Sequence, residues 1–271
     1  MFNNEIELLN IRLNILDQYV DHFVIIESAE THSGIKKRLT FDIEKFPQFR
    51  NKIIYGVIEK FPEKFSAWEK ENYQRNFISQ FLNKADDDDF IIISDLDEIP
   101  NLENINFEKI KDKFVFFRQH QIYYKFNLKL DNFEWIGSKS CRFKNLESPQ
   151  WIRDIKSKRF NWWRIDTFFS KKKYIGIRFI DNGGWHFSYL KNPKDIETKL
   201  KSYLHHIDYD LNPLGEEKIA EFIKDKKTVY NLKVDQRSNK FSTQNELKVM
   251  NSSFLPNYIL TNKEKFKEWI E

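Results

Sequence analysis

Apolar residues recur with two different patterns at the start of the chain. Ile6, Leu9, Leu13 and Leu16 follow helical spacing, so they predict a helix with one buried face. Residues 23–26 form a short continuous apolar run that ends in polar residues, which predicts a buried strand. The chain is therefore expected to begin with a helix followed by a strand.

The same alternation continues to about residue 100. Residues 53–58 form a second apolar run, and residues 90–93 form a third. Between them, Ser66 and Glu69 have the spacing of a capping box, so a helix is predicted to run from there to about Leu82. Strands that alternate with helices predict an α/β fold with a mostly parallel sheet flanked by helices.

The second half of the chain has a different pattern. Between residues 115 and 187, short aromatic and β-branched runs dominate and predict strands. Asn192-Pro193 opens a helix that is predicted to run toward Leu204. Residues 226–251 are polar and predicted to be rich in loops, whereas residues 254–260 are apolar enough to dock on the core. No linker or repeat divides the chain, so we predict one domain over its full length.

Composition and charge narrow the choice of partners. The chain has 271 residues, 40% hydrophobic and 16% aromatic, and its net charge of +4 is too small to predict nucleic-acid binding. The single cysteine, Cys141, excludes an internal disulfide and fits a reducing compartment. No apolar stretch approaches the roughly 20 residues of a membrane-spanning helix, and the first residues do not resemble a signal peptide. We therefore expect a cytoplasmic protein, soluble or peripheral to a membrane.

The most informative polar residues follow the strand predicted at residues 90–93. Asp95 and Asp97 lie two apart, so in an extended segment their carboxylates point to the same side. Open α/β sheets bind ligands at the carboxyl ends of their strands, and two neighbouring carboxylates favour a hard divalent cation that carries phosphates. The alternative is a solvated acidic turn, which the apolar run before the pair and Pro100 after it argue against. The acidic residues 86–89 are predicted to form an exposed turn.

A set of ordered segments, running nearly from end to end, carries a resemblance to a known family. The segments are Phe2-Asn3-Asn4-Glu5, Ile11-Arg12-Leu13-Asn14, Val24-Ile25-Ile26-Glu27-Ser28, Arg75, Ile92-Ile93-Ser94-Asp95-Leu96-Asp97-Glu98-Ile99-Pro100, Gly183-Gly184-Trp185-His186-Phe187-Ser188 and Leu255-Pro256-Asn257-Tyr258. Together they resemble glycosyltransferase family 17, whose members include the β-1,4-N-acetylglucosaminyltransferase that adds bisecting GlcNAc. An Asp-x-Asp motif alone would be a much weaker sign.

The resemblance implies a GT-A-type fold, a UDP-sugar donor, Mn²⁺ or Mg²⁺ as cofactor, and inversion at the anomeric carbon. The expected reaction transfers GlcNAc from UDP-GlcNAc to a hydroxyl of a glycan or glycoconjugate acceptor. Residues 1–112 would then form the nucleotide-binding half and residues 113–271 the acceptor-side half. Family members usually have an apolar strand directly before the Asn-Glu motif, where this chain has only Met1 and Phe2.

The matched motifs also suggest roles for single residues. Asp97 is expected to bind the metal, with Asp95 on the metal or on the ribose, so that the cation stabilises the charge of the departing diphosphate. His186 is a candidate third ligand or diphosphate donor, because Gly183-Gly184 before it allows a close backbone approach to phosphates; the alternative is a core histidine. Arg75 is expected either to contact the diphosphate or to be a solvated surface arginine.

Three further residues are assigned to the nucleoside end of the donor, and two carboxylates compete for the role of base. Asn4, Glu5 and Glu27 are expected at strand ends near the nucleoside. Inversion in one displacement needs a general base next to the acceptor hydroxyl. Asp181, close to the Gly-Trp-His motif, and Glu134, beside a tryptophan, are the candidates, and each has the alternative of an ordinary salt-bridged carboxylate.

Tryptophans and cations are interleaved in the second half of the chain. Trp151, Trp162 and Trp163 lie among seven basic residues between residues 156 and 173. The aromatic faces could stack on sugars, and the cations could hold an anionic glycan or a membrane surface. The alternative is a set of core tryptophans beside a solvated basic face. The pair His205-His206, near a helix end, is expected to cap the helix or lie at the surface.

Two other function classes were weighed against glycosyl transfer. A haloacid-dehalogenase-like phosphatase would use Asp95 as its nucleophile, but it would need Thr or Val where Ile99 stands and would leave the Gly-Trp-His motif unexplained. A non-catalytic sugar-binding module could use the tryptophans, yet it would have no use for a pair of carboxylates at a strand end.

Overall fold

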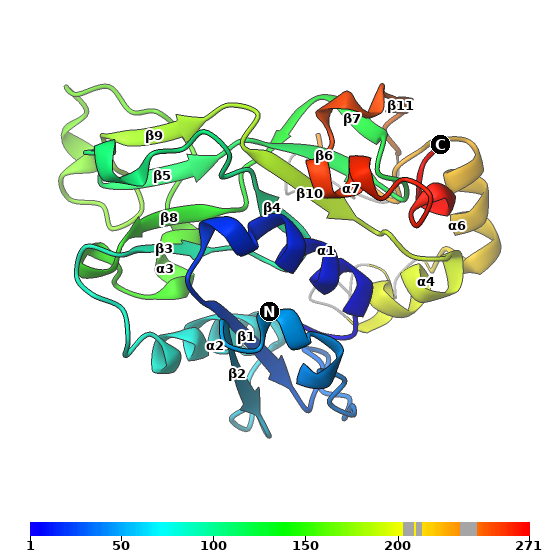
Figure 1. The fold of residues 1–271 in the computed structure, drawn as a ribbon, viewed down its shortest axis with the longest axis horizontal. Coiled ribbons are helices and arrows are strands. Elements are labelled where there is room, and N and C mark those ends of the chain that lie inside the picture. The colour runs from blue at the N-terminus through cyan, green and yellow to red at the C-terminus, as the bar shows by residue number, and fades with distance from the viewer. Residues whose placement is uncertain (203–208, 210–212, 234–242) are drawn as a thin grey trace.

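The computed structural model describes residues 1–202, 209, 213–233 and 243–271. The helices in this part are α1 (Ile6–Leu16), α2 (Ala67–Phe77), α3 (Pro149–Asp154), α4 (Pro193–Ser202), α6 (Gly215–Lys224) and α7 (Asn257–Thr261). The strands are β1 (Phe23–Ser28), β2 (Ile53–Ile58), β3 (Phe90–Ile93), β4 (Glu98–Pro100), β5 (Phe114–Phe117), β6 (Gln119–Tyr123), β7 (Leu128–Trp135), β8 (Lys139–Arg142), β9 (Ile177–Ile180), β10 (Gly184–Ser188) and β11 (Leu247–Val249) (Figure 1). None of the helices described is long and apolar enough to cross a membrane.

The α/β class is confirmed, but the prediction of a mostly parallel sheet is wrong. The strands form a parallel pair β1-β2, a sheet in the order β3-β8-β5-β9 and a sheet in the order β11-β7-β6-β10-β4. In the second of these, β8 lies antiparallel between β3 and β5, and in the third, β7 is antiparallel to both its neighbours. Strands from the second half of the chain therefore return beside β3, which helix–strand alternation in the first half could not indicate.

The elements predicted for the first hundred residues are all present. The first helix and the three strands occupy the predicted apolar runs. The capping box at the start of α2 is formed. The Ser66 hydroxyl accepts from the Glu69 backbone N–H, and the Glu69 carboxylate accepts from the Ser66 backbone N–H. Residues 86–89 are exposed, as expected for a turn. β3 thus leads directly into the Asp-x-Asp segment, which connects it to β4.

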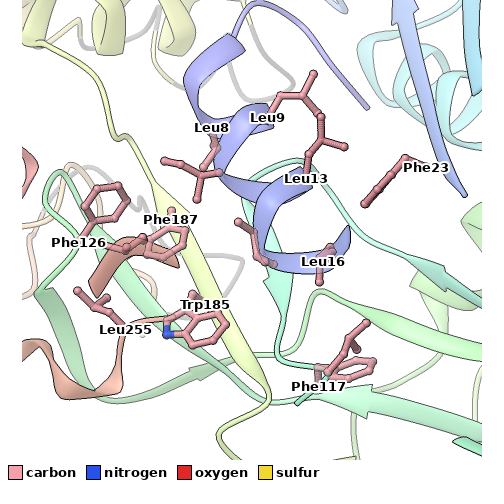
Figure 2. Packing of buried hydrophobic residues seen from close by; sticks show 14 of the residues in the cluster. Leu8, Leu9, Leu13, Leu16, Phe23, Phe117, Phe126, Trp185, Phe187 and Leu255 are labelled. Atoms are coloured by element: carbon pink, nitrogen blue, oxygen red, sulfur yellow. The ribbon is translucent and has the colours of Figure 1, made fainter. Parts of the chain in front are cut away.

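Helix α1 packs at the centre of the largest core cluster. Leu9, Leu13 and Leu16 are buried on it, and they share this cluster with Trp185 and Phe187 of β10. Figure 2 shows these side chains between the helix and the neighbouring strands. Full burial of one such leucine contributes about 1.5–3 kcal/mol. The apolar spacing found in the sequence therefore fixes α1, and with it Arg12, against the rest of the molecule.

Strands β1 and β3 belong to different sheets, and residues of both strands and of α1 line a cavity of about 570 Å³. Phe2 lies beside the carboxyl end of β1, where it bridges Glu27 in parallel and donates its backbone N–H to the Ile26 carbonyl at 2.9 Å.

The second half contains the expected short strands, and its end docks as predicted. Helix α4 begins at Pro193 as expected, while its predicted end and the pair His205-His206 lie outside the described residues. The polar stretch 226–251 lies partly outside them as well. Leu255 and Ile259 are buried in the same cluster as α1, which confirms that this tail packs on the core.

Candidate active site

Arg12 of α1 fixes the backbone of the segment between β3 and β4. Its guanidinium donates to the carbonyl oxygen of Glu98 at 2.6 Å and to that of Asp95 at 3.1 Å. It also donates to the Ser94 hydroxyl at 2.5 Å. The planar fork of donors on an arginine suits such a set of acceptors. The first helix therefore determines where the two aspartates of the motif stand.

Two arginines hold the Asp95 carboxylate. Arg75 Nη2 lies 3.1 Å from one of its oxygens, and Arg153 Nη2 lies 3.0 Å from the other. Burial would raise the pKa of Asp95, but the two guanidinium charges outweigh this effect and hold the pKa well below its usual range. Asp95 is thus an ionised carboxylate with both oxygens engaged. This pairing argues against Asp95 as the free nucleophile of a phosphatase.

Arg75 is buried, so it is not a solvated surface arginine. Besides Asp95 it contacts Glu71 at 2.7 Å and the side-chain carbonyl of Gln150. It is 4% exposed and does not line the cavity described below. Any effect of Arg75 on a donor would therefore act through Asp95.

Glu98 is the most deeply buried acidic residue of the motif. Glu98 is only 1% exposed. Its carboxylate accepts from Arg153 at 2.5 and 2.9 Å and from Trp135 Nε1 at 2.6 Å. Its Oε2 also accepts from the Asp95 backbone N–H at 2.8 Å. A buried carboxylate is tolerated only with such partners. Arg153 therefore links Glu98 and Asp95 into one network.

Asp97 points away from the arginines, toward α4 and β10. One of its oxygens lies 3.4 Å from Lys199 Nζ, and the other lies 3.7 Å from His186 Nε2. Lys199 also lies 3.2 Å from a Glu5 oxygen. Burial would raise the pKa of Asp97, but the positive charge of Lys199 outweighs this effect and lowers the pKa well below its usual range. Asp97 is therefore ionised and shares a cation with Glu5.

His186 is oriented by side chains of β6 and β10. Its Nδ1 lies 2.8 Å from Gln121 Oε1, its Nε2 lies 3.3 Å from Ser188 Oγ, and Gln121 Nε2 donates to that hydroxyl at 2.8 Å. All three contacts are satisfied together when Nδ1 carries the proton, because Gln121 Oε1 can only accept. The imidazole also packs on Trp135, with ring centroids 4.8 Å apart. Nε2 is then an acceptor that faces Asp97.

Gly184, the glycine of the Gly-Trp-His motif, lets β10 pack closely against β4. Gly184 has φ +131°, and a Cβ there would lie 2.1 Å from the Ile99 carbonyl oxygen and 2.8 Å from Pro100 Cα. Its partner in the antiparallel ladder is Pro100 of β4. The expected close backbone approach is therefore present, but it is made to β4, and it brings His186 opposite Glu98 in the ladder.

Asp97, His186, Lys199 and Glu5 line a cavity of about 330 Å³. The end of β1, α2 and Trp135 contribute further walls. Ligand pockets of small molecules typically span about 300–1,000 Å³. The cavity therefore brings together the Asn-Glu motif, the Asp-x-Asp motif and the Gly-Trp-His motif, three segments that are far apart in the sequence.

The side chains at this cavity fit a metal ion only in part. Among the residues that the structure describes, no three acidic, histidine or cysteine side chains are grouped so that they could hold a metal by themselves. Asp95, Asp97 and His186 are therefore not brought together as a ligand trio. Asp97 and the Nε2 atom of His186 do face each other as two acceptors, which is an arrangement that a cation between them would stabilise. Divalent cations on nucleotides often need only one or two protein carboxylates, because phosphates and waters complete the shell.

The remaining predicted site residues lie outside the lining of this cavity. Glu27 is fully buried and accepts from Lys37 and Tyr55, both at 2.8 Å, so it organises the loop after β1. Asn4 accepts from a lysine at 3.1 Å. Asp181 and Glu134 are exposed and both pair with Arg118, at 2.7 and 3.7 Å. Their placement does not support the predicted role of either carboxylate as general base.

Sequence reasoning missed several residues that shape the cavity. Lys199 is one of three lysines on α4, and Arg153 lies on the short helix α3. Nothing in their spacing distinguishes them from surface cations. Gln121 lies in a strand whose partners the sequence did not indicate. Glu98 and Arg12 were part of the matched motifs, but no separate role was assigned to them. Trp151 packs against the core cluster of β5 and β8, whereas Trp162 and Trp163 are exposed.

Comparisons with known proteins agree with this picture. The family model described as Glycosyltransferase family 17 matches residues 1–270. Three relatives, from Rattus norvegicus, Homo sapiens and Mus musculus, are each named beta-1,4-mannosyl-glycoprotein 4-beta-N-acetylglucosaminyltransferase. Each is 27% identical over 222 residues, which cover 74% of this chain and 41% of the relative. The chain thus spans about two fifths of the length of these relatives.

No solved structure matches the chain significantly. The family match, in contrast, extends over nearly every residue and includes all the segments that meet at the cavity. The chain therefore belongs to glycosyltransferase family 17.

Proposed function

We propose that this chain transfers GlcNAc from UDP-GlcNAc to a hydroxyl of a glycan acceptor, in a metal-dependent reaction that inverts the anomeric carbon. Family membership and the shared name of the relatives support glycosyl transfer of this kind. The observation that carries the proposal is the convergence of Asp97, His186 and Lys199 at one cavity. The motif carboxylates thus face a pocket that already contains a fixed cation.

In this proposal Asp97 and His186 hold the divalent cation, Mn²⁺ or Mg²⁺, together with the donor diphosphate. When bound, the cation supplies Lewis-acid stabilisation of the negative charge on the departing UDP. Gln121 accepts from Nδ1–H and so leaves Nε2 unprotonated, as is usual for histidines that bind metals, and the cation would replace the Ser188 hydroxyl at the Nε2 lone pair. Asp95 has a positioning role, because its oxygens are engaged by Arg75 and Arg153.

Lys199 is proposed to contact the diphosphate directly. Its ammonium group lies between Glu5 and Asp97, and these two carboxylates, despite burial, raise its pKa, so it stays charged. A cation held rigidly in a half-buried site stabilises developing negative charge without reorganisation.

The general base is proposed among the carboxylates that line the cavity. Glu30 lines it at the end of β1, and among the described residues it is the lining carboxylate that forms no ion pair; it accepts a long bond of 3.4 Å from the Phe61 N–H. A group with this freedom can approach an acceptor hydroxyl. Glu30→Gln should therefore lower the rate far more than Asp181→Asn or Glu134→Gln. Equal losses in all three variants would contradict this assignment.

The donor can be tested by a screen of nucleotide sugars with Mn²⁺, scored by nucleotide release. UDP-GlcNAc should give the highest turnover, above UDP-glucose and UDP-galactose, and EDTA should abolish it. Turnover that persists in EDTA would contradict metal dependence. Preference for GDP or CMP donors would contradict the proposed donor class.

A matched pair of variants on α4 separates the role of Lys199 from general electrostatics. Lys199→Met should reduce affinity for UDP, because it removes the cation next to Asp97. Lys201→Met, two residues further along the same helix, removes an exposed lysine that pairs with Glu197 at 2.9 Å. Equal UDP affinity in the two variants would contradict a diphosphate contact by Lys199.

A further inference from the structure

The segment 156–175, between α3 and β9, exposes an unusual number of large apolar side chains. Five of them, with exposed fractions from 61% to 86%, are Trp162, Trp163, Ile165, Phe168 and Phe169. They fall within eight consecutive residues of the sequence. Large apolar side chains that gather in this way on a surface commonly mark a contact with another molecule or a membrane.

The same segment carries a large local excess of positive charge. Residues 156–175 contain seven lysines and arginines and one aspartate, a net charge of +6. Since the whole chain has a net charge of +4, the other residues together carry −2. The cations are Lys156, Lys158, Arg159, Arg164, Lys171, Lys172 and Lys173. The aromatic residues are therefore flanked on both sides by basic residues.

The segment is anchored at its base, so its apolar side chains are held outward. The Lys156 backbone N–H donates to the Lys172 carbonyl at 2.7 Å, which closes the segment into a loop. Trp151 of α3 donates its indole N–H to the Lys171 carbonyl at 2.9 Å. Within the loop, Arg164 pairs with Asp166 at 2.7 Å, and Trp162 packs edge-on against Trp163. With these contacts in place, the side chains of Trp162, Trp163, Phe168 and Phe169 remain more than half exposed.

We propose that the 156–175 segment docks on the surface of an anionic lipid bilayer. Its tryptophans and phenylalanines would enter the interface between headgroups and acyl chains, where aromatic side chains are enriched. Its lysines and arginines would remain at the level of the headgroups and bind their negative charges. The docking is independent of the reaction proposed above, because it uses no residue of the cavity.

Charge complementarity favours a lipid surface over a sugar or a second copy of the chain. A sugar acceptor would use tryptophan faces, but it would not account for Ile165, Phe168 and Phe169 in the same patch. A second copy would bring its own +6 segment against this one if the contact were symmetric, and like charges disfavour that contact. An anionic bilayer satisfies both the apolar and the basic residues.

The test is co-sedimentation of the full chain with extruded vesicles of phosphatidylcholine, with and without phosphatidylglycerol. The chain should bind the anionic vesicles at least about tenfold more strongly than the neutral ones, as expected for several basic residues near the surface. The emission of its tryptophans should shift to the blue on binding. This shift should be much smaller in a Trp162→Ser/Trp163→Ser variant.

Two further variants separate insertion from simple charge attraction. Phe168→Ser/Phe169→Ser should reduce binding to anionic vesicles at least about tenfold, since it removes two side chains that insert. Lys158→Gln/Lys171→Gln should reduce it as well and should weaken its dependence on salt. The control is Trp68→Ser, which removes an exposed tryptophan on α2 and should leave binding unchanged. All these side chains are exposed, so we expect each variant to fold. Its melting temperature verifies this.

Three results would overturn the proposal. The first is equal binding to neutral and anionic vesicles, or binding to neither. The second is full retention of vesicle binding by the Phe168→Ser/Phe169→Ser variant, because binding would then not depend on insertion of these side chains into the bilayer. The third is self-association, seen by light scattering without vesicles and lost in the same variant, which would assign the patch to a contact between copies of the chain.

Discussion

Two groups of cations in this molecule differ in burial and in partners. The first surrounds the Asp-x-Asp segment, where Arg12, Arg75, Arg153 and Lys199 are each bound to carbonyl or carboxylate oxygens. The second is the exposed 156–175 segment, which contains seven cations and one aspartate; Arg164 and Lys173 pair with this aspartate, and Lys172 pairs with Asp154 of α3. The residue types are the same in both groups. What differs is whether the fold supplies the matching negative charge.

The difference indicates what each group can do. In the first group, internal oxygens hold the cations in place, so the three arginines fix geometry, and Lys199 is the cation of this group that lines the cavity. In the second group, only part of the positive charge is paired within the protein, and we propose that a partner outside the protein binds the rest. Charged residues that bind opposite charges inside the protein fix the geometry of a site. Charged residues that lack such partners at the surface are available to bind another molecule.

The largest expected effect on stability comes from Arg153→Met. Removal of this guanidinium leaves Glu98 buried without a cation, which should lower the free energy of unfolding by about 3–5 kcal/mol. The measurement is urea unfolding at neutral pH, followed by circular dichroism.

The matched control is Arg164→Met, because Arg164 also binds a carboxylate with two bonds but is exposed. It should leave the unfolding midpoint essentially unchanged. Similar losses in the two variants would remove the distinction between the two groups of cations.

His186→Ala should reduce the rate by roughly 10²–10³, the scale of losing one group that stabilises transition-state charge. The rate must be compared per folded molecule, with the melting temperature measured on the same sample. His186→Asn should restore more activity if hydrogen bonding is the role and less if metal binding is. An unchanged rate per folded molecule together with a lower melting temperature would make His186 a core residue only.

The smallest expected effect concerns Lys139, a buried cation bound to carbonyls. Its ammonium donates to the Arg153 carbonyl at 2.7 Å, and burial, with the charge of Arg153, lowers its pKa from 10.5 to about 7. Between these two values the unfolded chain binds a proton that the folded chain has lost, so stability should rise with pH. The rise from this group should not exceed about 1.4 kcal/mol per pH unit.

Lys139→Met should remove that rise, while groups common to both proteins cancel in the comparison. Urea unfolding of the two proteins at pH 7, 8 and 9 measures the difference, which should change steadily in favour of the wild type. Parallel curves over this range would show that Lys139 does not change its charge there.

The sequence predicted local elements well because their signals are local. Helix α1 and strand β3 follow directly from apolar spacing, and the start of α2 follows from Ser66 and Glu69. Sheet pairing depends on residues far apart, so the antiparallel return of β8 beside β3 was missed. The hydrophobic pattern of a buried strand is the same for a parallel and an antiparallel neighbour.

The site was predictable only where its residues lie in motifs. Asp97 and His186 were identified correctly as neighbours, although they are far apart in the sequence. Lys199 and Arg153 were missed because the position of a basic residue on a helix does not show which distant carboxylates it will bind. Asp181 was placed near the site by its closeness in sequence to Gly183, but it pairs with Arg118 at the surface instead.

The central claim is that the cavity at Asp97 binds a UDP-sugar with a divalent cation. Its most direct test is calorimetric titration of UDP, with Mn²⁺ present, into the wild type and Asp97→Asn. The wild type should bind UDP only with the metal, and Asp97→Asn should lose this binding and turnover while its melting temperature stays close to that of the wild type. Equal UDP affinity in the two proteins, or wild-type binding that persists in EDTA, would contradict the claim.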